Sequence, residues 1–307
     1  MDKKYFFSLN EYYRKVYGEK AYKISLNGGM SCPNRDGTIS NRGCIFCSAK
    51  GSGDFASDYR MDITEQITEG IKLISDKYKG SFYIGYFQAF TNTYAPIEKL
   101  EEIFTKAILD DRLCGLSIAT RPDCLSDEVI LLLKRLNEIK PITIELGLQT
   151  VNEATAIYIN RGYPLSVYDD ACNRLLNANI PFVVHMIVGL PRETTMDFLN
   201  TASHISKSGA SGIKIQLLHV LKNTELAKDY ESGLFEAMTL EDYVKSVVDI
   251  IEILPGDMVI HRITGDGPRD LLISPMWSTN KKNVLNSINR EFTKRNTYQG
   301  KEYHQWQ

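Results

Sequence analysis

Residues 181–194 read PFVVHMIVGLPRET and join a strand pattern to a helix start. The apolar, β-branched run predicts a buried strand over residues 181–188, because a parallel sheet covers both faces of its strands. Gly189 ends that run. Thr194 and Asp197 have the spacing of a capping box, which predicts that a helix begins there. The stretch therefore predicts one strand followed by one helix.

The same alternation recurs on both sides of that stretch. Strand patterns are expected over residues 23–27, 81–87, 115–119, 142–148, 181–188, 213–219 and 258–263. Helix starts between them are indicated by capping residues: Asp62 with Glu65, Ser126, Ser166 with Asp169, Thr194 with Asp197, and Thr239 with Asp242. Strand then helix, repeated six times, predicts a parallel sheet in an α/β protein. Periodicity leaves a doubly wound sheet and a barrel open, and in both the reactive groups are expected at the carboxyl ends of the strands.

Composition indicates a soluble globular protein. The chain has 307 residues, of which 43% are hydrophobic and 24% charged. No apolar run is long enough to span a membrane, and the charged start lacks the apolar core of a signal peptide, so we expect a cytoplasmic protein with no membrane partner. A net charge of -2 gives no sign of a nucleic-acid binder.

Three cysteines lie within one short segment. Cys32 and Cys44 are separated by eleven residues, and Cys44 and Cys47 by two. A two-residue gap lets both sulfurs point the same way, so the three thiols can converge on one metal centre. Structural zinc needs a fourth ligand, and the nearest candidates are the distant Cys114 and His185. A four-iron cluster with three thiolates leaves one iron open for chemistry, so cluster, zinc and incidental thiols all remain possible.

Polar residues interrupt the apolar strand patterns near their ends. Glu145 and Gln149 lie within residues 144–150 (IELGLQT), where buried polar groups need partners that a ligand can supply. The guanidinium of Arg161 suits a carboxylate, whereas the alternative is a surface ion pair. His185 alone favours a hydrogen-bonded core residue.

The two ends of the chain differ from the middle. Residues 1–22 mix aromatic and basic residues, a pattern that fits either RNA stacking or a helix that caps the barrel, and we favour the cap. Residues 261–270 (HRITGDGPRD) are either a solvated loop or a substrate-contact segment through Arg262, Asp266 and Arg269. The expected organisation is an N-terminal cap over 1–22, a core over 23–256 and a C-terminal extension over 257–307 that is expected to face the substrate. Residues 277–307 of that extension form a modest basic patch.

The cysteine segment also carries a family resemblance. Residues 31–37 (SCPNRDG), 43–48 (GCIFCS) and 51–55 (GSGDF) resemble the cluster loop of radical S-adenosylmethionine (SAM) enzymes. The match is closest to the YhcC/YtqA-type proteins, and the long gap after the first cysteine recurs in the Elongator catalytic-subunit class. The resemblance covers nearly the whole chain. It implies a TIM-like, open (β/α)6 partial barrel and a [4Fe-4S] cluster held by Cys32, Cys44 and Cys47.

The same resemblance assigns SAM contacts by position. Residues 87–93 (FQAFTNT) replace a glycine-rich family loop that holds the SAM amino group, and they lack its glycines. Residues 117–123 (SIATRPD) resemble an Elongator-class segment, with Ala119 where relatives often have glutamate. The residues implied as SAM contacts are Gln88, Thr91, Thr93, Gln149 at the ribose, Arg161 at the carboxylate, His185, and Gly189 at the adenine and ribose edge.

The resemblance implies that the chain cleaves SAM to methionine and a 5'-deoxyadenosyl radical, with an electron donor such as flavodoxin or ferredoxin. For YtqA-type proteins it further implies a tRNA partner and conversion of 5-carboxymethylaminomethyl to 5-aminomethyl uridine at the wobble position. Arg262 or Arg269 is then expected to bind the carboxylate that this substrate carries. The alternatives are a radical SAM enzyme for a small metabolite and a non-enzymatic zinc or iron-sulfur scaffold.

Overall fold

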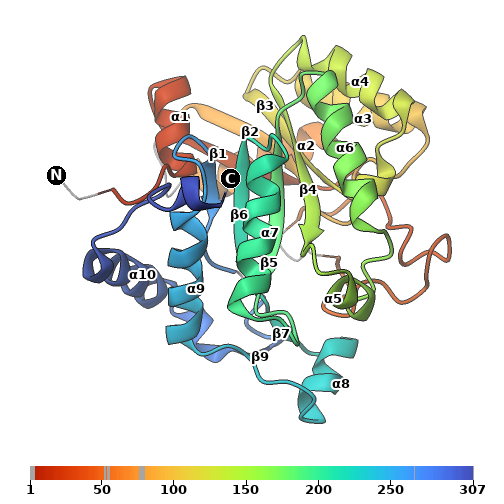
Figure 1. Ribbon diagram of the computed structural model, residues 1–307. Coiled ribbons are helices and arrows are strands. Elements are labelled where there is room, and N and C mark those ends of the chain that lie inside the picture. The colour runs from red at the N-terminus through yellow and green to blue at the C-terminus, as the bar shows by residue number, and fades with distance from the viewer. Residues whose placement is uncertain (1–3, 52, 54–55, 76–79, 266, 307) are drawn as a thin grey trace.

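The computed structural model describes residues 4–51, 53, 56–75, 80–265 and 267–306. Its centre is a curled, seven-stranded parallel sheet (Figure 1). The strands, in the order in which they pair, are β1 (Ala21–Leu26), β2 (Phe82–Phe87), β3 (Leu113–Thr120), β4 (Ile142–Gln149), β5 (Phe182–Val188), β6 (Gly212–Leu217) and β8 (Val259–Arg262). A doubly wound sheet reverses its strand order, whereas this order follows the chain. The predicted partial barrel is therefore confirmed.

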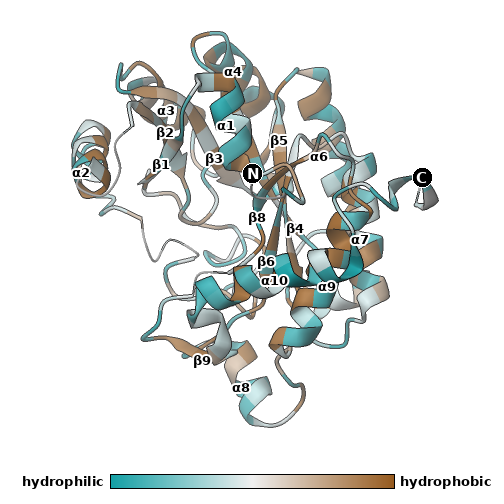
Figure 2. Ribbon diagram, turned by 90° about the vertical axis from the view of Figure 1, so that its left-hand side faces the viewer, coloured by the Kyte–Doolittle hydropathy of each residue, from teal (hydrophilic) through white to brown (hydrophobic). Residues whose placement is uncertain are grey.

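Helices cover the outer face of this half-barrel. They are α2 (Ile63–Ser75), α3 (Ile97–Ile108), α4 (Asp127–Asn137), α6 (Leu165–Asn177), α7 (Thr195–Lys207) and α9 (Leu240–Glu252). Alternate strand residues such as Ile24, Leu146 and Val184 are fully buried in the apolar core between sheet and helices. In Figure 2 the strands are mostly brown, whereas α1 carries much teal. Because one set of alternate side chains fills this layer, the other set faces the inside of the curl.

Each of the seven expected strands is found, with bounds within two residues of those predicted. Ser126, Thr194 and Thr239 cap α4, α7 and α9 as expected. The prediction of a capping box at Ser166 is wrong, because α6 begins directly after Pro164, whose fixed φ already suits a helix start.

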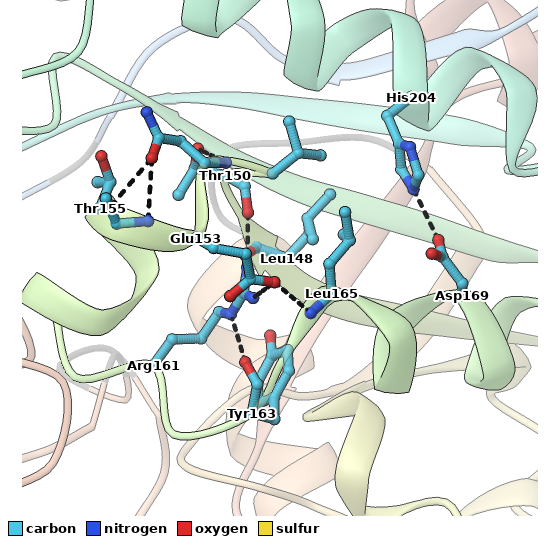
Figure 3. Close-up of polar contacts among 12 residues, drawn as sticks. Leu148, Thr150, Glu153, Thr155, Arg161, Tyr163, Leu165, Asp169 and His204 are labelled. Carbon is cyan, nitrogen blue, oxygen red and sulfur yellow. Dashed lines mark hydrogen bonds and ion pairs between the residues drawn. The ribbon is translucent and has the colours of Figure 1, made fainter.

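The carboxylate of Asp169, predicted to complete that capping box, contacts a histidine instead. Asp169 of α6 lies 2.6 Å from the ring nitrogen Nε2 of His204, on the neighbouring α7 (Figure 3). The contact joins two adjacent helices on the outer layer.

The N-terminal aromatic residues pack as a cap. Ser8 and Glu11 form a capping box at the start of α1 (Leu9–Tyr17), and Ser8 forms a parallel bridge with Ile260 of β8. Tyr5 stacks on Phe292, with ring centroids 5.1 Å apart. Tyr5 is thus packed against the apolar core, which favours the cap over RNA stacking.

The C-terminal region packs on an outer helix and also adds a strand at the carboxyl end of the sheet. Its helix α10 (Lys281–Arg295) packs on α9, where Arg295 pairs with Asp249 and Glu252 and so neutralises part of the basic tail. An antiparallel pair that the sequence did not predict, β7 (Val220–Leu221) with β9 (Leu272–Ser274), extends the carboxyl end of β6. The short helices α5 (Glu153–Tyr158) and α8 (Glu225–Glu231) lie near the same end (Figure 1). In the described part of the chain, no helix is long and apolar enough to cross a bilayer.

Candidate active site

The three cysteines line one cleft at the carboxyl ends of the strands. Cys32, Cys44 and Cys47 lie on the loop after β1, each half-buried, and border a cavity of about 190 Å³, the cysteine cleft. Its opposite walls come from strand ends and following loops and include Gln88, Thr91, Arg121, Gln149, Arg161 and His185. The loop and the strands therefore meet around one space, as the fold class predicts.

Two side chains from the motif itself hold the cysteine loop. The amide of Asn34 donates to the carbonyl oxygen of Asn160 at 2.6 Å, and its nitrogen lies 3.6 Å from the sulfur of Cys44. Arg35 donates to the carbonyl oxygens of Cys47 and Ser48 at 3.0 and 2.7 Å. Both side chains thus donate hydrogen bonds to backbone carbonyl oxygens, and these bonds fix the path of the cysteine loop.

The donor set of this loop fits an iron-sulfur cluster. Thiolates are the ligands of such clusters, and an N–H group close to a sulfur, as at Cys44, is one of the contacts that tune them. Burial, with Cys47 nearby, raises the pKa of the free Cys44 thiol to about 12, whereas a coordinated thiol is deprotonated outright. Among the described residues, no three His, Cys, Asp or Glu side chains are grouped to hold a single metal ion.

Five of the seven expected SAM contacts border the cysteine cleft: Gln88, Thr91, Gln149, Arg161 and His185. Thr93 does not line that cleft, and its hydroxyl instead bonds the hydroxyl of Thr120 at 2.6 Å and the carbonyl of Cys124 at 2.5 Å. Gly189 has φ +92°, and an added Cβ would lie 3.0 Å from the sulfur of Met238. The backbone conformation and this neighbour therefore explain the glycine.

Arg161 is a buried clamp on the end of β4 (Figure 3). Its side chain is 1% exposed, so the alternative of a surface ion pair is wrong. The guanidinium donates to the carbonyl oxygens of Leu148, Thr150 and Tyr163 at 3.2, 2.6 and 3.0 Å, and it lies 3.3 Å from Glu153. Four contacts from one rigid group fix the loop that forms a wall of the cleft.

Glu145 lies at the centre of a charged network inside the curl. Its fully buried carboxylate contacts Lys23 at 2.5 Å, Lys214, and the hydroxyl of Ser117 at 2.7 Å. A ligand was expected to supply these partners, but neighbouring strands supply them. Burial alone would raise the pKa of Glu145, yet Lys214, Lys23 and His185 hold it well below its ordinary value.

The same network fixes the state of His185 and perturbs Lys214. The amide nitrogen of Gln216 lies 3.0 Å from Nδ1 of His185, so Nε2 carries the proton that is donated to Glu145 at 2.7 Å. Burial, with Lys214 nearby, lowers the pKa of His185 to about 4, and the ring is neutral at pH 7. Burial also lowers the pKa of Lys214 to about 7, although Glu145 opposes that shift.

A second cavity lies against the cysteine cleft. This lumen chamber has a volume of about 410 Å³ and shares Cys47, Gln88, Lys214 and Arg262 with the cleft. Its other walls include Lys23, His219, His261, Gly265 and Gly267. The two cavities therefore adjoin, and Cys47 lines both of them.

The three expected substrate contacts fall in different places. Arg262 lines both cavities. Arg269 is exposed and instead borders a surface groove of about 810 Å³ with Lys50 and Lys222. Asp266 lies outside the described residues.

Sequence analysis did not select the lysines of the chamber, although a signal was present. Residues 23–26 (KISL) and 212–217 (GIKIQL) alternate polar and apolar side chains. A strand buried between helices and a packed barrel should be apolar on both faces. Such alternation therefore indicates a polar interior, and Lys23 and Lys214 are its charged members.

Comparisons with known proteins give matches over most of the chain. Residues 36–205 match the family model of the Radical SAM superfamily, and residues 210–294 match that of the Radical SAM C-terminal domain. Uncharacterized protein YtqA of Bacillus subtilis (strain 168) is 47% identical over 298 residues, which cover 97% of this chain and 92% of YtqA. Protein YhcC of Escherichia coli (strain K12) is 34% identical over 275 residues, covering 89% and 88% of the two chains.

A solved structure shares the fold. The archaeal Methanocaldococcus infernus Elp3 with an N-terminal deletion aligns with a TM-score of 0.69 at 15% sequence identity. The alignment covers 93% of this chain and 67% of that one. At this identity the likeness concerns the fold alone.

Proposed function

The chain belongs to the radical SAM superfamily, and from that premise we propose that it modifies a uridine at the wobble position of tRNA. Enzymes of this superfamily use a [4Fe-4S] cluster and SAM. When bound and reduced, the cluster supplies the electron that cleaves SAM to methionine and a 5'-deoxyadenosyl radical, which takes a hydrogen atom from the substrate.

One observation carries the assignment of the site. Cys32, Cys44 and Cys47 border the same cleft as the polar strand ends at Gln88 and Gln149. We propose that the three thiolates hold the cluster and that the strand ends orient SAM beside it. Arg161 keeps the loop after β4 in place and Asn34 anchors the cysteine loop, so both walls of the cleft are held before any ligand binds.

The substrate class is supported by the resemblance to YtqA-type proteins and by positively charged side chains along the surface groove beside the lumen chamber. Lys50, Lys222 and Arg269 line the surface groove next to the cysteine loop, and Gly267 and Pro268 border both that groove and the lumen chamber. Cations in this arrangement suit the phosphates of a single strand whose base enters the chamber. The specific reaction that we propose is the conversion of 5-carboxymethylaminomethyl to 5-aminomethyl uridine.

The test is anaerobic turnover with defined RNA. Reconstituted protein receives reductant, SAM and tRNA from a strain that lacks this protein, and 5'-deoxyadenosine and the wobble nucleoside are quantified. We expect the tRNA to stimulate 5'-deoxyadenosine formation and the 5-aminomethyl nucleoside to appear. Equal 5'-deoxyadenosine with and without tRNA would contradict the RNA substrate and direct the search to small metabolites.

A further inference from the structure

The lumen chamber is rich in positive charge. Among the described residues that line it, Lys23, Lys214 and Arg262 are cations, and none is a carboxylate. Glu145 contacts both lysines from the adjoining cleft wall, so two lysines share one carboxylate. The side chains of Lys23 and Lys214 are only 18% and 7% exposed. When both lysines are protonated, they exceed the charge of Glu145 by one unit, at a place that is largely shielded from water.

The network is built on strands and so cannot easily rearrange. Lys23 lies on β1, Glu145 on β4 and Lys214 on β6, and the curl of the sheet brings them together. The ammonium groups of Lys23 and Lys214 also lie 4.6 and 4.7 Å from the ring centroid of Tyr86, on β2. Both ammonium groups are thus held against the chamber wall by contacts from two sides.

Uncompensated buried charge is unfavourable, and a bound anion would relieve it. The lowered pKa of Lys214, caused first by burial, shows the same strain. Arg262 adds a planar guanidinium on the same cavity, a group that matches the two oxygens of an oxyanion. The chamber also borders Cys47, so a group bound there lies next to the cysteine cleft.

We propose that the lumen chamber is an oxyanion site in which Lys214, with Lys23 and Arg262, binds a carboxylate or phosphate group of the substrate. This inference deepens the proposed function. It rests on that function, which makes the lumen chamber the place where the substrate binds. Lys214 should contribute most to oxyanion binding, because it is the more deeply buried of the two lysines that contact Glu145.

The first test measures anion binding without turnover. The thermal unfolding midpoint of the reconstituted holoprotein is recorded against sodium acetate, sodium phosphate and the uncharged control acetamide, at constant ionic strength. We expect a saturable rise of a few degrees with an oxyanion and none with acetamide. A larger effect of acetate assigns a carboxylate group, and a larger effect of phosphate assigns a phosphate group.

Matched variants locate the site. In Lys214→Met the apparent affinity for the oxyanion should fall at least tenfold, whereas Lys282→Met, on the exposed face of α10, should leave it unchanged. Without anion, Lys214→Met should unfold at the same temperature as the wild type or higher, since a buried excess charge has been removed. An oxyanion effect of equal size in Lys214→Met, or none in the wild type, would overturn the proposal.

A second measurement needs no variant and so does not depend on folding of Lys214→Met. Lysines of the wild-type holoprotein are reductively methylated with formaldehyde, and the rates at Lys214 and Lys282 are read by peptide mass spectrometry. The oxyanion should slow labelling of Lys214 several-fold and leave Lys282 unchanged. Equal slowing at both would refute the site. Because neither readout involves SAM cleavage, failure here is distinguishable from failure of the proposed reaction.

Discussion

The cysteine cleft and the lumen chamber share a wall but are built from different parts of the chain. One loop carries the thiols of the cleft, and hydrogen bonds from Asn34 and Arg35 to backbone carbonyls hold it. The chamber instead takes its cations from inner faces of strands, around the buried Glu145. The difference teaches that the proposed cofactor side depends on a few anchored loops, whereas the proposed substrate side depends on charge placed on a rigid sheet. Substitutions should therefore affect the two cavities in different ways.

The largest effect is expected in the cleft. Cys44→Ala should reduce iron from about four atoms per chain to nearly none, because two thiolates are left for a cluster that needs three. The thermal midpoint of the iron-free protein should change little, since the loop is held by side chains other than the cysteines. Iron analysis after anaerobic reconstitution measures this result. Cys114→Ala, outside the cleft, is the control, and a full iron content in Cys44→Ala would refute the ligand assignment.

The next effect concerns the clamp on the cleft wall. Arg161→Met removes the donor for three carbonyl oxygens and should cost on the order of 3 kcal/mol, a fall of about 6 °C in thermal midpoint. The fall should occur with and without SAM. Arg135→Met, which breaks an exposed pair with Glu101, should change the midpoint by far less. An unchanged midpoint in Arg161→Met, with SAM binding alone weakened, would contradict the clamp.

A pH effect should distinguish the chamber from the cleft. Burial lowers the pKa of Lys214 to about 7 from its ordinary 10.5, against the opposing effect of Glu145. Between these values the unfolded chain binds a proton that the folded chain has released, so the free energy of unfolding rises with pH. The titratable groups that face Lys214 are Glu145, Lys23, Tyr86, Arg262, His185 and His261.

From pH 7.0 to 8.5 the wild type should therefore gain on the order of 1 kcal/mol more stability than Lys214→Met. Thermal midpoints of both proteins at the two pH values measure the difference, and Lys282→Met should follow the wild type. Parallel profiles for the wild type and Lys214→Met would show that Lys214 keeps an ordinary pKa.

The smallest expected effect distinguishes Arg262 from Arg269, either of which sequence analysis expects to bind the substrate carboxylate. Arg262 lines the chamber, whereas Arg269 lies on the exposed groove. Arg262→Gln should weaken the acetate or phosphate dependence of the thermal midpoint several-fold, and Arg269→Gln should leave it unchanged. A reversal of this order would place the oxyanion site in the surface groove.

Much of this arrangement could be predicted from local pattern. The alternation of strands and helices predicted all seven strands of the sheet, because its hydrophobic periods are local. The spacing of Cys32, Cys44 and Cys47 predicted one site for the same reason. The capping box at Ser166 failed because Pro164 already starts the helix.

The chamber depends on long-range geometry. Lys23 and Glu145 are 122 positions apart, and only the curl of the sheet brings them together. The clamp at Arg161 likewise depends on how the loop after β4 folds back on that strand. Alternation within single strands indicated polar inner faces, but no local pattern could show that two lysines share one carboxylate. Pairing across a curved sheet is a tertiary property.

The most direct test of the central claim is whether SAM binds at a cluster in the cysteine cleft. The electron paramagnetic resonance spectrum of the reduced, reconstituted protein would be recorded before and after addition of SAM. The account predicts that SAM changes the spectrum, because three thiolates leave one iron open to it. Identical spectra at saturating SAM, in protein with full iron content, would contradict the account.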